Sequence, residues 1–93
     1  RGESVKYRIV IDGLLSEFAG GEGVLLDLTR KRYHLLNPTA GFIWTALEKE
    51  PLTEDALADA LVARYQIEPD RARQTATQFA AQLVDMGLIE ASK

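Results

Sequence analysis

Hydrophobic and polar positions alternate at the start of the chain. The hydrophobic members of this pattern are Val5, Tyr7, Ile9 and Ile11, and the residues between them are Lys6, Arg8 and Val10. A period of two residues is typical of a strand that buries one face, so we expect a first strand here. From Asp12 to Phe18 no period is sustained and glycines follow, which predicts a turn or loop that packs a few side chains on the core.

Two apolar runs further along, Gly23 to Leu28 and Tyr33 to Leu36, flank a short polar segment. This layout predicts two antiparallel strands joined by a tight turn. Because the turn has no Asn-Gly or Asp-Gly pair, a loop longer than two residues remains an alternative to the tight turn.

The expected register of this hairpin follows from a two-residue tip at residues 30–31, which pairs Leu28 with Tyr33 and Leu26 with Leu35. One face then carries Val24, Leu26, Leu28, Tyr33 and Leu35, and the other carries Leu25, Asp27, His34 and Leu36.

Three helices follow, each with a clear start. Asn37 caps the first helix and Pro38 takes its first position, where a missing N–H costs nothing. Thr53 caps the second, Pro69 opens the third, and Gly87 suits the end of the third. Hydrophobic residues recur at helical spacing, in turn Ala40, Ile43, Trp44 and Leu47, then Leu57, Leu61 and Tyr65, then Ala72, Ala76, Phe79, Leu83 and Met86.

The order of elements predicts an α+β fold, a three-stranded antiparallel sheet followed by three helices. Leu88 and Ile89 form a short apolar tail that we expect to close the core, and we expect Trp44 in that core. The helices between Thr53 and Met86 form a pair of the kind found in helix-turn-helix and winged-helix domains. A chain of 93 residues fits one domain, residues 1–93, with an ordered core of about 5–90.

The composition limits the functions that we expect of this chain. The chain is 46% hydrophobic and 27% charged, which argues against disorder. No window reaches the roughly 18 apolar residues of a membrane span, and we expect a cytoplasmic protein that does not bind membranes. With no cysteine and one histidine, His34, we expect no metal site and no cofactor. The net charge of −3 weakens attraction to nucleic acid.

Three stretches in order resemble the PqqD-like family of precursor-peptide recognition elements: VLLDLTRKRYHLLNPTAGFIW, LTEDALADALVARY and QLVDMGLIE. The resemblance covers nearly all of the chain from about Val5. Its most specific part is a strand that ends in Leu-Asn, followed by a helix with Ile43 and Trp44, and backed by Gly87 and Leu88 near the end.

The resemblance implies a winged helix-turn-helix-like fold that binds the leader segment of a ribosomally made precursor peptide without catalysis. Discrete B1 proteins of lasso peptide biosynthesis look most similar. They imply as partners a separate leader peptidase of the B2 type and a cyclase, with the chain a monomer when bound.

The family also implies where the leader lies: added as a strand beside Tyr33 to Leu36, in a cleft with the third helix. The residues that we expect to contact it are Leu26, Tyr33, His34, Leu35, Leu36, Asp70, Arg73, Ala76, Thr77, Ala80 and Leu83. Leu26, Leu35, Ala76, Ala80 and Leu83 are expected to form the apolar pockets. No catalytic or metal-binding residue is expected.

Three alternatives stay open. The chain is also similar to stand-alone members that serve a radical enzyme in pyrroloquinoline quinone assembly. A helix-turn-helix would present for nucleic acid Asp70, Arg71, Arg73, Gln74, Thr77, Gln78 and Gln82. An enzyme would use Asp27 and His34, neighbours across the hairpin, as an acid–base pair, although no motif places a nucleophile beside them. The basic tip at residues 30–32 is interpreted as a solvated turn, or as a site that attracts an acidic leader or the partner protease.

Overall fold

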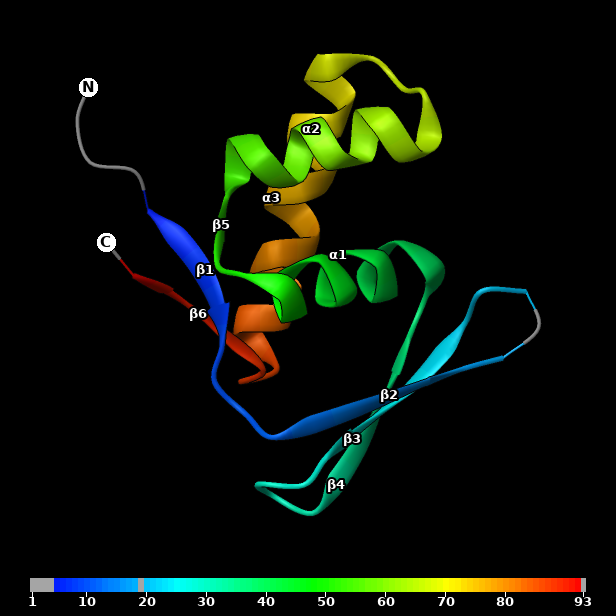
Figure 1. Ribbon diagram of the computed structural model, residues 1–93, viewed down its shortest axis with the longest axis vertical. Helices are drawn as coiled ribbons and strands as arrows, with labels where there is room; N and C mark the ends of the chain where they lie inside the picture. The colour runs from blue at the N-terminus through cyan, green and yellow to red at the C-terminus, as the bar shows by residue number, and fades with distance from the viewer. Residues whose placement is uncertain (1–4, 19, 93) are drawn as a thin grey trace.

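The computed structural model describes residues 5–18 and 20–92, and in them three helices and two small sheets (Figure 1). The elements follow in the order β1 (Lys6–Ile9), β2 (Gly13–Glu17), β3 (Gly23–Asp27), β4 (Arg32–Leu36), α1 (Pro38–Lys49), β5 (Leu52–Thr53), α2 (Glu54–Tyr65), α3 (Pro69–Asp85) and β6 (Ile89–Ser92). A three-stranded antiparallel sheet followed by three helices is therefore present, and the predicted α+β class is confirmed.

The helix starts are formed by the residues that the sequence predicts. The Asn37 side chain accepts a hydrogen bond from the Ala40 N–H at 2.9 Å, and Thr53 Oγ1 accepts one from the Ala56 N–H at 3.0 Å. Each bond satisfies a main-chain donor that the first helical turn leaves unpaired. At the other end of α3, Gly87 has a φ of +78°, which glycine adopts without strain.

The sheet before the helices has the strand order β2-β3-β4. The expectation of a loop from Asp12 to Phe18 is wrong, because Gly13–Glu17 forms β2 and pairs with β3. The pattern of hydrophobic residues does not reveal this strand, because the adjacent Leu14 and Leu15 interrupt the alternation of hydrophobic and polar positions. Leu15 packs against the core, whereas Leu14 lies on the opposite face with 56% of its surface exposed.

The hairpin of β3 and β4 forms, but its expected register is wrong. Leu26 lies opposite Tyr33 and Val24 opposite Leu35, so the loop comprises residues 28–31. Lys31 takes the left-handed conformation with a φ of +60°, which closes this longer loop. Because the shift is two residues, each side chain keeps its expected face.

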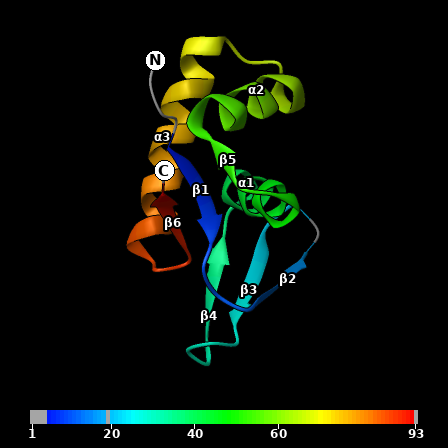
Figure 2. The same cartoon turned by 60° about the vertical axis from the view of Figure 1, so that its left-hand side comes forward.

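A second sheet has the order β5-β1-β6, and it contains the first predicted strand. That strand forms as Lys6–Ile9, but it pairs with Leu52–Thr53 and with the C-terminal strand rather than with the hairpin. The apolar tail at Leu88 and Ile89 is buried and continues into β6. Figure 2 shows β6, β1 and β5 above the hairpin sheet.

The core lies where the helices meet the inner faces of both sheets. Trp44 is buried there, as predicted, and its Nε1–H donates to Glu48 Oε2 at 3.1 Å. The largest other fully buried side chains are hydrophobic, namely Leu25, Ile43, Leu57, Leu61, Leu83, Leu88 and Ile89. In the described residues no helix is both long and apolar enough to cross a membrane.

Candidate peptide-binding edge

Strand β4 lies at an edge of its sheet. Among the described residues it pairs with β3 alone. Figure 2 shows β4, β3 and β2 side by side below α1, with β4 nearest to the C-terminal end of α3. An unpaired edge carries a row of main-chain donors and acceptors that a further strand can use.

Two hydrogen bonds determine which main-chain groups β3 directs toward β2. The Phe18 N–H donates to the Glu22 carbonyl at 2.7 Å, and the Leu28 N–H donates to the Asp12 carbonyl at 2.8 Å. In an antiparallel ladder successive residues direct their N–H and C=O to opposite sides. The even-numbered residues of β3 therefore bond toward β2, and the odd-numbered residues bond toward β4.

The same alternation continues into β4. Its partners on β3 are odd-numbered: Gly23 lies opposite Leu36, and Leu25 lies opposite His34. His34 and Leu36 consequently use their main-chain groups on β3. The groups that β4 directs outward are the N–H and C=O of Tyr33 and Leu35.

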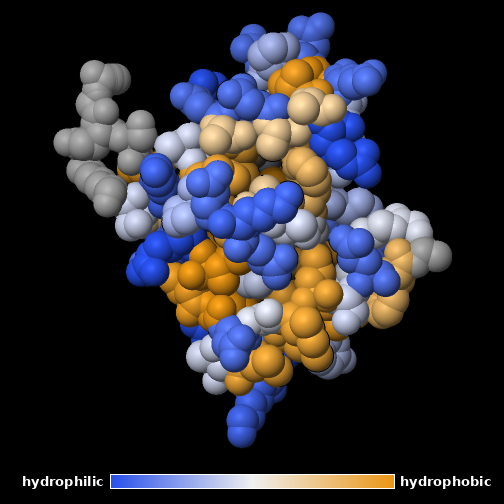
Figure 3. Space-filling view, in the orientation of Figure 1, coloured by the Kyte–Doolittle hydropathy of each residue, from blue (hydrophilic) through white to orange (hydrophobic). Residues whose placement is uncertain are grey.

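The side chains of these two residues lie on the sheet face that points away from the core, which we call the outer face. Leu35 is 75% exposed and Tyr33 is 67% exposed. The register continues the outer face across the sheet, since Tyr33 lies opposite Leu26 and Leu26 lies opposite Leu14. Figure 3 shows hydrophobic side chains over the lower half of the molecule, where Figure 1 places the hairpin of β3 and β4.

The inner face of β4 is different. Leu36 is buried in the core, and His34 is partly buried. The Nε2 atom of His34 is inaccessible to solvent and has no hydrogen-bond partner among the described residues.

The sequence profile of the family described as coenzyme PQQ synthesis protein D (PqqD) matches residues 22–89, which include this edge and all three helices. The chain belongs to the PqqD family. A search of curated protein sequences finds no match for this PqqD-family protein.

Two solved structures are similar to this PqqD-family protein in fold. One is described as TbiB1 in complex with the TbiA(beta) leader peptide; it has a TM-score of 0.73 and 24% identity, covering 89% of this chain and 94% of that chain. The other is described as lasso peptide synthetase B1 complexed with the leader peptide; it has a TM-score of 0.68 and 24% identity, covering 90% of this chain and 96% of that chain.

The predicted pocket residues of the PqqD-family protein fall into two separate groups. Leu26 and Leu35 lie on the outer face of the sheet, whereas Ala76, Ala80 and Leu83 are buried on the inward side of α3. The structure does not bring these groups together. Sequence periodicity assigns each residue to a face of its own element, but it does not say which faces meet.

The polar residues predicted on α3 face α2. The Thr77 hydroxyl donates to Glu54 Oε1 at 3.0 Å, and Arg73 forms an ion pair with Asp55. Asp70 is exposed and lines a shallow hollow with Arg73 between α2 and α3. These contacts place acidic side chains beside two residues of the supposed recognition helix, which disfavours a nucleic-acid phosphate there.

The acid–base pair considered for an enzyme does not form in this PqqD-family protein. Asp27 lies opposite Arg32 rather than His34, and its carboxylate accepts hydrogen bonds from Arg30. The sequence predicts Arg30 in a solvated tip, but the side chain also contacts Gly87, a partner 57 residues away that no local pattern indicates.

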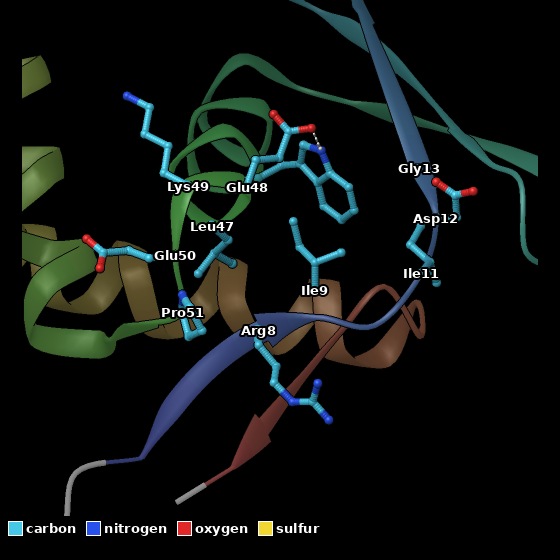
Figure 4. Close-up of a pocket in the computed structure, with 11 residues that line it drawn as sticks. Arg8, Ile9, Ile11, Asp12, Gly13, Leu47, Glu48, Lys49, Glu50 and Pro51 are labelled. Atoms are coloured by element: carbon cyan, nitrogen blue, oxygen red, sulfur yellow. Dashed lines mark hydrogen bonds between the residues drawn. The ribbon is translucent and has the colours of Figure 1, made fainter.

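A hollow lies elsewhere on the molecule, between α1 and the segment that joins β1 to β2 (Figure 4). Its volume is about 460 Å³, and its lining mixes Arg8 and Lys49 with Asp12, Glu48 and Glu50. In residues 5–18 and 20–92 no cluster of three potential metal ligands occurs. No residue of β4 lines this hollow.

Proposed function

We propose that this protein is a non-catalytic recognition module that binds the leader segment of a ribosomally made precursor peptide as an added strand at β4. The observation that carries the proposal is the unpaired edge at Tyr33 and Leu35, whose outward main-chain groups are flanked by exposed apolar side chains. Strand addition at such an edge is a general mode of peptide recognition. Membership of the PqqD family and the similarity to two leader-bound structures support it.

Main-chain pairing alone does not account for useful affinity. The N–H and C=O groups of two residues offer four hydrogen bonds, each contributing a net of about 0.5–1.5 kcal/mol, or about 2–6 kcal/mol in total. Ordering five peptide residues costs about 5–10 kcal/mol. Side-chain contacts must supply the difference, so we propose that Tyr33, Leu35 and the partly buried His34 contribute to selectivity.

We further propose that the leader belongs to a lasso peptide precursor, and that this module delivers it to a separate leader peptidase and to a cyclase. The cleft with α3 is part of this proposal, and Leu36 supports the edge from within. Asp70, Arg73 and Thr77 lie toward α2, so we do not include them among the residues that contact the leader. The alternative within the family is delivery of a peptide to a radical enzyme. The genes that flank this one distinguish the two pathways.

The test is fluorescence anisotropy with a labelled synthetic leader from the precursor gene that neighbours this one. We expect saturable binding with a Kd on the order of tens of micromolar or lower. The matched control is the same leader with a scrambled order of residues. Absence of binding in this concentration range contradicts the proposed function.

A second measurement tests the absence of catalysis. The full precursor is incubated with this protein alone and then with the peptidase encoded nearby, and its mass is followed by mass spectrometry. We expect an unchanged precursor in the first case and accelerated removal of the leader in the second. Cleavage by this protein alone contradicts a purely binding role.

A further inference from the structure

The buried carboxylate of Asp27 requires a compensating partner. Asp27 is 1% exposed, and it is the one buried charged side chain in the described part of the chain. Its Oδ1 accepts the Arg30 main-chain N–H at 3.0 Å, and its Oδ2 lies 3.3 Å from Arg30 Nη1. A buried charge without such partners is strongly unfavourable. The loop between β3 and β4 is therefore held to β3 by Arg30.

The same guanidinium has a second partner at the far end of α3. Arg30 Nη1 donates to the Gly87 carbonyl at 2.9 Å. A Cβ atom at position 87 would lie 2.8 Å from Nη1, so glycine permits this approach. Carbonyls at the end of a helix lack partners within the helix, and a cation stabilises them.

These contacts form a bridge, Asp27–Arg30–Gly87, between two parts of the protein that both pack against α1. β4 packs against β3 and α1, whereas α3 packs against α2, α1 and β6. The bridge joins the loop at the start of β4 to the residue that follows α3. It therefore spans the two walls between which the proposed leader strand lies.

We propose that Arg30 is a positioning residue for leader binding, which holds the free edge of β4 at a set distance from α3. This inference rests on the proposed function. The side chain of Arg30 is 43% exposed, and it stabilises the fully buried carboxylate of Asp27. Its role in leader binding is separate from that effect. Its contribution is geometric: one guanidinium nitrogen, Nη1, lies within hydrogen-bond distance of both the Asp27 carboxylate and the Gly87 carbonyl, so a single side chain links the end of β3 to the end of α3.

The test compares leader binding by Arg30→Met and Lys31→Met with that of the wild type. Both variants remove one positive charge from the same loop, but Lys31 takes no part in the bridge. We expect Arg30→Met to weaken leader binding by about tenfold, because a binding surface that must be ordered first binds less tightly. Lys31→Met should bind within about twofold of the wild type.

Loss of Arg30 also leaves Asp27 buried without its partner, which lowers stability. The double variant Asp27→Asn, Arg30→Met removes that charge and should unfold at a higher temperature than Arg30→Met. All affinities are measured well below the lowest unfolding temperature. We expect the double variant to recover stability while its leader affinity remains reduced. Recovery of affinity together with stability overturns a positioning role.

The distance between β4 and α3 can be measured directly, and this measurement does not depend on the stability of the variant. The chain has no native cysteine, so spin labels can be attached through Arg32→Cys on β4 and Gln82→Cys on α3, both at exposed positions. We expect a narrow distance distribution with Arg30 present and a broader one in the double variant. Equal distance distributions contradict the inference. A loss of binding in Lys31→Met equal to that in Arg30→Met also contradicts it, because it indicates attraction of the leader by charge. If the wild type binds no leader, the proposed function itself fails.

Discussion

At the scale of single residues, Tyr33 and Leu35 combine two properties that a soluble protein rarely leaves together. Their main-chain groups point away from β3, and their large side chains are exposed on the outer face. His34, between them, has the opposite orientation and helps to hold β4 to β3. Neighbouring residues of one short strand therefore have different roles. A substitution must be chosen according to whether the residue directs its main-chain groups to β3 or to the free edge.

We expect Leu35→Pro to weaken leader binding by about tenfold or more while the protein stays folded. Proline removes an N–H that points to the free edge, and edge strands tolerate it at such positions. Binding is measured by anisotropy and folding by circular dichroism. The control is Glu17→Pro, which removes an outward N–H from the opposite edge of the sheet at β2. Unchanged affinity in folded Leu35→Pro contradicts strand addition at β4.

At the scale of elements, the junction between β4 and α1 joins the proposed binding edge to the core. Leu36 is buried at the end of β4, Asn37 caps α1, and Trp44 lies two turns into the helix within the core. The cap ends the strand and starts the helix within one residue, so the edge is anchored close to the site where a peptide would add.

We expect Asn37→Ala to lower the free energy of unfolding by about 1 kcal/mol, because the Ala40 N–H loses its acceptor. Urea denaturation followed by the fluorescence of Trp44 measures the change. Asn37→Asp keeps a side-chain acceptor and should stay within about 0.5 kcal/mol of the wild type. An alanine variant as stable as the wild type would show that this cap contributes nothing here.

At the scale of the whole molecule, one carboxylate joins three elements that are distant in sequence. Glu54, at the start of α2, accepts hydrogen bonds from the Tyr7 hydroxyl of β1 and from the Thr77 hydroxyl of α3, each at 3.0 Å. Burial raises the pKa of Tyr7 above its usual value of 10.0, and the hydrogen bond to Glu54 and its negative charge add to the increase.

This raised pKa predicts a loss of stability at alkaline pH. Because the unfolded Tyr7 ionises first, its contribution to stability is fully present below pH 10.0 and is lost as the pH rises through the higher pKa of the folded state. We expect the stability difference between the wild type and Tyr7→Phe to shrink above pH 10.0, as measured by urea denaturation at a series of pH values. A difference that does not change with pH contradicts this contribution.

Local patterns in the sequence were sufficient to predict the helices, the hairpin and the faces of its strands. Asn37, Thr53 and Pro69 mark helix starts through bonds and backbone preferences that involve near neighbours only. β2 was not predicted, because Leu14 is hydrophobic although it is exposed beside Leu15. The register of β3 and β4 was not predicted, because it depends on the left-handed conformation of Lys31, which no short turn motif indicates. The β4 edge was predicted through a family resemblance, whereas its outward residues follow from hydrogen bonds in the structure.

The sequence by itself determined the three helices, the hairpin of β3 and β4, the core-facing side of these elements and the absence of cysteine, because these depend on residue types and short-range spacing. Only the tertiary structure decided that β1 leaves the hairpin sheet to pair with β5 and β6, that Tyr33 and Leu35 face the open edge, and that Arg30 reaches Gly87. These features depend on which distant segments meet, and that choice is made by the packing of the whole chain rather than by any local pattern.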